Sequence, residues 1–96
     1  MKIKELKNGM SNVSVEGKIV EIEETRHVQT KYGKRSVADA TLEDETGRIG
    51  LSLWEGQINL VSIGDKVLIS GAFVTRFRDK LQLSVQRSGK IEVLKG

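Results

Sequence analysis

The chain has 96 residues, a net charge of +3, one histidine and no cysteine. These numbers fit one domain with a single core and exclude a disulfide framework and a structural zinc site, so neither a metal nor a cofactor is expected. The sequence has no apolar run of membrane-spanning length and no signal-peptide core, which predicts a soluble, cytoplasmic protein. The mild positive charge is compatible with a polyanionic partner, but it also fits a merely soluble surface. The positions of the charges must decide between these two interpretations.

A short lead-in and a long bent strand open the chain. In residues 1–12 the apolar positions have helical spacing and predict one turn, with Ile3 and Leu6 plugging the end of a barrel. Residues 13–25 predict a strand whose apolar parity changes from odd to even after Gly17. Such a change is typical of a bulge or a sharp bend, so we expect a glycine bulge in this strand, which would then serve both halves of a barrel.

Residues 26–35 continue this strand into a hairpin rich in cations, which reverses at Tyr32-Gly33. Tyr32 at the tip is interpreted as a solvated turn residue. The returning strand, residues 36–42, places Asp39 on its outward face and three apolar residues inward: Ala38, Ala40 and Leu42.

An acidic turn leads into the third strand. In Asp44-Glu45-Thr46-Gly47 the aspartate side chain can bond the backbone ahead of it, and the acidic residues are otherwise interpreted as solvated. The strand alternates strictly, with one face made of Ile49, Leu51 and Leu53 and the other of Arg48, Gly50, Ser52 and Trp54. Trp54, the only tryptophan, is therefore expected on the non-core face, where it suits a flat partner.

The second half of the chain predicts a short helical turn between Trp54 and Asp65, then a fourth strand over residues 64–77. Gly71 shifts the register of this strand, because Val67 and Ile69 point inward before it and Ala72 and Val74 after it. The shift turns Phe73 and Phe77 outward; without it, both rings belong to the core. Residues 81–85 form a fifth strand, Ser88-Gly89 breaks it, and residues 90–94 add a final short strand.

These elements predict an all-β, five-stranded OB-fold barrel that occupies residues 1–96 as a single domain, with a short helical turn between strands three and four. That fold characteristically binds oligonucleotides or oligosaccharides across its second and third strands. The sequence offers no nucleophile with a matching base and no glycine-rich loop leading into a helix, so no enzymatic activity is expected. His27, in the hairpin arm, is interpreted as a surface residue.

Three aromatic residues, Trp54, Phe73 and Phe77, meet on the predicted non-core face. Unpaired bases stack on such rings with roughly 1–3 kcal/mol per base. Phe73 and Phe77 are four residues apart in one strand and hence about 13 Å from each other, which fits successive or alternate bases.

Cations gather at both hairpin tips beside this face: Arg26, Lys31, Lys34, Arg35, Arg76, Arg78 and Lys80. All of these except Arg26, together with Arg48, Ser52 and the three aromatic residues, make up the predicted nucleic-acid site; the alternative is a pair of solvated tips. Asp39 shares the outward face. Its carboxylate repels phosphate unless it neutralises a nearby cation or accepts a hydrogen bond from a base amino group.

Three blocks carry a resemblance to a known family: residues 29–35, residues 44–54, and residues 72–77 followed by Leu81-Gln82-Leu83. They are similar to the archaeal single-stranded DNA-binding proteins and to the DNA-binding OB domains of replication protein A, over about residues 12–85. The resemblance implies that single-stranded DNA stacks on Trp54, Phe73 and Phe77, in DNA replication, recombination or repair.

The chain departs from that family pattern at two points. Family members often carry a second tryptophan where this chain has Phe73, which implies a smaller stacking platform. Simple archaeal members end in a flexible tail, whereas this sequence stops at Gly96. We therefore expect either a complete small protein or one module of a longer replication protein A-like chain, with other OB domains as partners.

Three functions remain open on the sequence. The first is binding of single-stranded DNA with little sequence preference, the second is binding of single-stranded RNA by the same surface, and the third is an OB domain used as a protein-interaction scaffold. Contacts to 2′-hydroxyls would favour RNA, and aromatic rings covered by protein would favour the scaffold.

Overall fold

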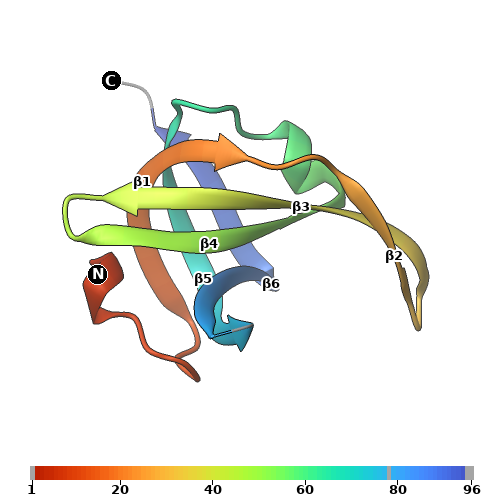
Figure 1. The fold of residues 1–96 in the computed structure, drawn as a ribbon, viewed down its shortest axis with the longest axis horizontal. Helices are drawn as coiled ribbons and strands as arrows, with labels where there is room; N and C mark the ends of the chain where they lie inside the picture. The colour runs from red at the N-terminus through yellow and green to blue at the C-terminus, as the bar shows by residue number, and fades with distance from the viewer. Residues whose placement is uncertain (1, 78, 95–96) are drawn as a thin grey trace.

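The computed structural model describes residues 2–77 and 79–94; the side chains of Phe77 and of residues 86–88 lie outside that description. Two 3-10 turns, η1 (Ile3–Glu5) and η2 (Glu55–Asn59), accompany six strands (Figure 1). The strands are β1 (Val13–Ile22), β2 (Arg26–Thr30), β3 (Gly33–Asp44), β4 (Gly47–Trp54), β5 (Lys66–Phe77) and β6 (Lys80–Leu94).

Five of these strands close a barrel. The hydrogen-bonded order is β1-β5-β6-β4-β3-β2, and a further pairing between β1 and β3 closes the ring. All pairings are antiparallel except that of β4 with β6. Strand β2 pairs with the first part of β3 outside the ring, and the two form an arm that projects from the barrel (Figure 1). The predicted five-stranded OB-fold connectivity is confirmed.

The core follows the predicted alternation. Apolar side chains from all five ring strands are fully buried, among them Ile19, Leu42, Leu51, Ile69 and Leu83. Ile3 and Leu6 of the lead-in belong to the same buried cluster, so the predicted plug at the end of the barrel is confirmed. The predicted helical cap after Trp54 is the 3-10 turn η2.

The bulge predicted at Gly71 is confirmed. The pairing of β5 with β6 shifts register between Ser70 and Ala72, and Gly71 has a φ of 67°, a conformation that favours glycine. Val67 and Ile69 are buried before the bulge, and Ala72 and Val74 are buried after it. Phe73 and Thr75 after the bulge therefore present their side chains to the outside, as the sequence predicted.

The parity change predicted after Gly17 is confirmed as a bulge, but the bulge lies between Ile19 and Glu21 rather than at the glycine. The inward alternation of β1 continues through Gly17 to Ile19, and the register with β3 shifts between Ile19 and Glu21. Gly17 has a different role, because β1 crosses there from β5 to β3: a Cβ on Gly17 would lie 2.7 Å from the backbone oxygen of Glu43. The strand does serve both halves of the barrel, as expected.

Two strand boundaries also differ from prediction. The first strand ends at Ile22, and residues 23–25 interrupt it before β2 resumes the run to the hairpin tip. The predicted break at Ser88-Gly89 is wrong as well, since β6 runs without interruption from Lys80 to Leu94. Its ladder instead contains a bulge: Ala72 faces Val85, whereas Ser70 faces Lys90. The two strands approach closely at Gly89: a Cβ there would lie 2.5 Å from the backbone oxygen of Ser70. Because glycine has no side chain, β6 can continue through this position.

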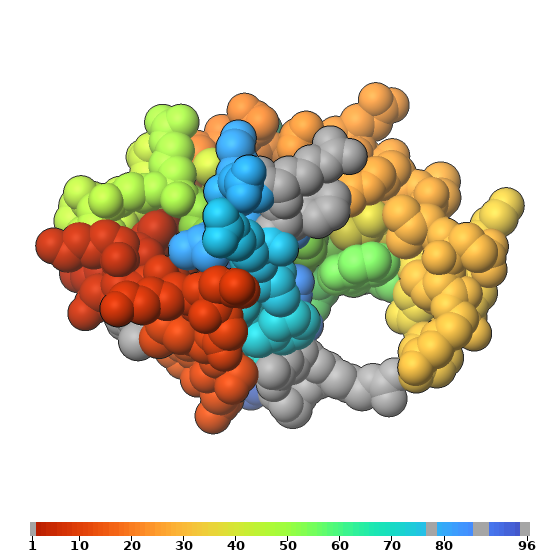
Figure 2. Space-filling view, turned by 60° about the horizontal axis from the view of Figure 1, so that its bottom comes forward, coloured from red at the N-terminus to blue at the C-terminus, as the bar shows by residue number. Residues whose placement is uncertain are grey.

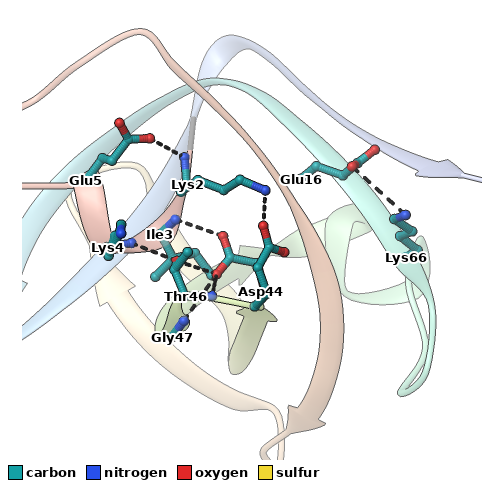
Figure 3. Close-up of polar contacts among 10 residues, drawn as sticks. Lys2, Ile3, Lys4, Glu5, Glu16, Asp44, Thr46, Gly47 and Lys66 are labelled. Carbon is teal, nitrogen blue, oxygen red and sulfur yellow. Dashed lines mark hydrogen bonds and ion pairs between the residues drawn. The ribbon is translucent and has the colours of Figure 1, made fainter.

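The acidic turn between β3 and β4 anchors the N-terminal plug (Figure 3). One carboxylate oxygen of Asp44 accepts hydrogen bonds from the backbone N–H groups of Thr46, at 2.7 Å, and Gly47, at 3.1 Å, as the predicted Asx turn requires. The other oxygen accepts from the N–H of Ile3 at 2.8 Å, and Lys2 pairs with Glu45. The interpretation of Asp44 as a merely solvated turn residue is therefore wrong.

We expect this anchor to weaken in acid. Burial raises the pKa of Asp44, but hydrogen bonds from the Thr46 hydroxyl, the Ile3 N–H and the Thr46 and Gly47 N–H groups outweigh it and lower the pKa to about 2. Because the folded pKa lies below the unfolded one, this stabilisation is complete above pH ~4 and is lost as the pH falls to ~2. Unfolding free energies should therefore fall over this window by about 1–2 kcal/mol more in the wild type than in Asp44→Asn. Equal pH profiles in urea unfolding would contradict the anchor.

Candidate nucleic-acid interface

The side chains that do not face the core line up in rows across β3, β4, β6 and β5. We call this surface the outer face. One row pairs Thr41, Gly50, Gln82 and Thr75, and the next pairs Asp39, Ser52, Ser84 and Phe73. A third row begins with Val37 and Trp54, where β3 turns into the arm. Two of the three predicted aromatic residues thus lie on one continuous face, one row and two strand spacings apart, which puts their backbones roughly 12 Å from each other.

Trp54 ends β4 on the outer face, as the alternation predicted, and is half-buried. It lies directly opposite Val37, which is 1% exposed although it is on the outer face. The backbone N–H of Trp54 donates to the side-chain oxygen of Gln57 in η2 at 3.0 Å, which secures the end of the strand. The tryptophan therefore combines a partly open ring with a fixed backbone and an apolar neighbour.

Phe73 is half-buried on the outer face of β5, opposite Ser84. Its outward orientation follows from the bulge at Gly71, where the pairing of β5 with β6 shifts register. Phe77 ends β5 with the same parity and pairs with Lys80, but its side chain lies outside the described residues, as does all of Arg78. Ser52, between Trp54 and Phe73, is 7% exposed and forms part of the floor.

A cavity of about 700 Å³ opens at one end of the outer face. Its lining includes Arg48 and Lys80 on one side and the carboxylates of Glu21, Glu23 and Asp39 on the other. Trp54 and Phe73 do not line it; they lie further along the same face. The cavity therefore places cations at the end of the face remote from the arm, and its opposite wall is acidic.

Two of the predicted arginines are paired with carboxylates. Arg48 donates to Glu43 at 2.6 Å and Arg76 to Asp79 at 3.0 Å. Arg76 shares the parity of Ala72 and Val74 rather than that of Phe73, so it points away from the outer face at the end of β5. Lys80 is exposed and has the parity of the outer face.

The remaining predicted cations lie on the arm. Lys34 is exposed, and the cationic groups of Lys31 and Arg35 lie 5.1 and 5.9 Å from the centre of the Tyr32 ring. Tyr32 is exposed at the tip, as expected. Figure 2 shows a hollow between the arm and the η2 turn.

Sequence reasoning missed a polar network on the floor of the outer face. Arg26 donates to one oxygen of Asp39 at 2.6 Å, and the side-chain amide of Gln82 donates to the other at 3.2 Å. Of the two alternatives for Asp39, the structure shows the first, neutralisation of a nearby cation. The strict alternation of residues 81–85 already placed Gln82 on the outer face, and that signal could have identified it.

A five-stranded ring with OB connectivity, aromatic residues on its outer face and cations at its margins defines a domain of the OB class. Residues 6–93 match the family model described as single-stranded DNA binding protein Ssb-like, OB fold. The chain belongs to this family, which confirms the resemblance drawn from the three sequence blocks.

Named relatives and solved structures agree with the family. The single-stranded DNA binding protein Ssb of Saccharolobus solfataricus is 37% identical over 90 residues, and the match covers 94% of this chain and 61% of that protein. Replication factor A of Methanothermobacter thermautotrophicus is 31% identical over 93% of this chain and 11% of its own length. An OB domain from Thermoplasma acidophilum has a TM-score of 0.87 at 32% identity, covering 100% of this chain and 87% of that one. The chain thus spans about three fifths of one protein relative and a small part of the other.

The two protein relatives are named for DNA binding and for replication, so the family is one of binding proteins, as expected. Within residues 2–77 and 79–94, no group of three or more His, Asp or Glu side chains is placed to hold a metal ion. In the same ranges, no helix has the length and apolar character needed to cross a membrane.

Proposed function

We propose that this domain binds single-stranded DNA with little sequence preference. Bases stack on Trp54, Phe73 and Phe77, and phosphates contact Arg48, Ser52, Lys80 and the cations of the two hairpins: Lys31, Lys34, Arg35, Arg76 and Arg78. The observation that carries the proposal is the common outer face of Trp54 and Phe73 in an Ssb-like OB fold, because stacking on aromatic rings tolerates every base.

The domain acts in replication, recombination or repair as a cytoplasmic, nucleoid-associated protein. The names of the two relatives support the role in replication. On this proposal residues 1–96 are one OB module, and further OB domains, in the same chain or in a partner, add affinity by raising the effective concentration of each module near the strand.

The single tryptophan makes the proposal directly testable. Adding oligo-dT should quench the fluorescence of Trp54, and log K should fall linearly with log salt, with a slope of roughly −0.7 per phosphate contacted. Oligo-U in place of oligo-dT separates DNA from RNA, since only RNA offers 2′-hydroxyl contacts. Absence of quenching at low salt and high oligonucleotide concentration would refute both nucleic-acid functions and leave the scaffold.

A further inference from the structure

Three arginines among the described residues are paired with carboxylates at or beside the candidate interface: Arg26 with Asp39, Arg48 with Glu43, and Arg76 with Asp79. The first pair is the most sheltered. The side chain of Asp39 is 27% exposed, against 89% for Asp79. Exposed pairs exchange readily with solvent and contribute little, so Asp39 is the carboxylate best able to hold its arginine against a competitor.

One side chain from the arm and one from the barrel fix Asp39. Arg26, on β2, donates to one oxygen at 2.6 Å, and Gln82, on β6, donates to the other at 3.2 Å. Gln82 reaches β3 across β4 and passes beside Gly50: a Cβ on Gly50 would be in ordinary contact with Cγ of Gln82, at 3.5 Å. The carboxylate is therefore oriented on the floor of the outer face, one strand from Ser52 and in the same row as Phe73.

We propose that Asp39 is an internal competitor for phosphate: its carboxylate occupies Arg26 in the free protein and lowers the affinity of the outer face for single-stranded DNA. A carboxylate and a phosphate offer a guanidinium the same charge-assisted hydrogen bonds, so Asp39 holds Arg26 away from the bound strand in the wild type. Arg26 is half-exposed and can turn from one anion to the other. The inference rests on the proposed function.

A role for Asp39 in reading a base amino group makes the opposite prediction. It requires a free acceptor directed at the base, whereas both oxygens of Asp39 already accept from protein donors. If Asp39 read a base, its removal would weaken binding; if it competes with phosphate, its removal strengthens binding. The sign of one measurement therefore separates the two roles.

The test is the salt dependence of oligo-dT binding by the full chain and its Asp39→Asn variant. Freeing Arg26 for one more phosphate should make the slope of log K against log salt more negative by about 0.7. The ratio of the variant's affinity to that of the wild type should therefore be about fivefold higher at 0.1 M salt than at 1 M salt. Asp39→Ala, which removes the charge without leaving an amide, should give the same change. The double variant Arg26→Gln/Asp39→Asn should return to the wild-type slope, because the additional cation is gone.

Glu16→Gln is the matched control. It makes the same change in net charge, but Glu16 pairs with Lys66 (Figure 3). Both residues line a depression separate from the cavity beside the outer face. An unchanged slope or weaker binding in both Asp39 variants overturns the inference, and so does equal tightening by Glu16→Gln. Absence of oligo-dT binding by the wild type refutes the proposed function instead.

Discussion

Trp54→Ala should weaken oligo-dT binding by about 5- to 150-fold, the equivalent of the roughly 1–3 kcal/mol that one stacked base contributes. Trp54 is the largest aromatic ring on the outer face, and its backbone is held by Gln57, so the loss concerns the ring itself. The slope of log K against log salt should stay unchanged, because no charge is removed. Since the variant has no tryptophan, anisotropy of a labelled oligo-dT is the suitable measurement.

Two controls define this result. Trp54→Phe keeps a stacking ring and should lose much less affinity than Trp54→Ala. Tyr32→Ala removes an aromatic ring at the exposed tip of the arm, away from the outer face, and should also have the smaller effect. Binding by Trp54→Ala within twofold of the wild type, with an unchanged unfolding transition, would exclude stacking on this residue.

Gly17→Ala should destabilise the domain by about 1–3 kcal/mol, the usual cost of overpacking. The added methyl group would lie 2.7 Å from the backbone oxygen of Glu43 and 2.9 Å from Cγ of Leu42. Leu42 is fully buried and Glu43 lies in the β1–β3 ladder, so neither can retreat without opening the barrel. For a domain of this size, each kcal/mol corresponds to a fall of about 4–8 °C in the melting temperature.

Gly56→Ala is the control for this substitution, because a Cβ on Gly56 would meet no atom within 4 Å. Its unfolding free energy should stay within about 0.5 kcal/mol of the wild type. A Gly17→Ala variant as stable as Gly56→Ala would show that β1 and β3 do not approach as closely as their register implies.

Most of the fold was predictable because its signals are local. Burial on one face of a strand leaves a two-residue period in the sequence, and this period placed Trp54 on the outer face and located the bulge at Gly71. The same alternation predicted the five strands of the ring. Boundaries were less well determined, since the bulge opposite Gly71 lets β6 continue through the glycine that the sequence suggested would end it.

The tertiary structure decided what depends on contacts between distant segments. Gly17 carries a parity signal that resembles a bulge, yet its role is set by the backbone of β3. Asp44 bonds Ile3 across 41 positions of sequence, and Gln82 bonds Asp39 across 43. The amino-acid sequence by itself determined which side chains face outward, because alternation belongs to each strand alone. Which of them meet was decided only by closure of the barrel, because the register between strands sets every contact across it.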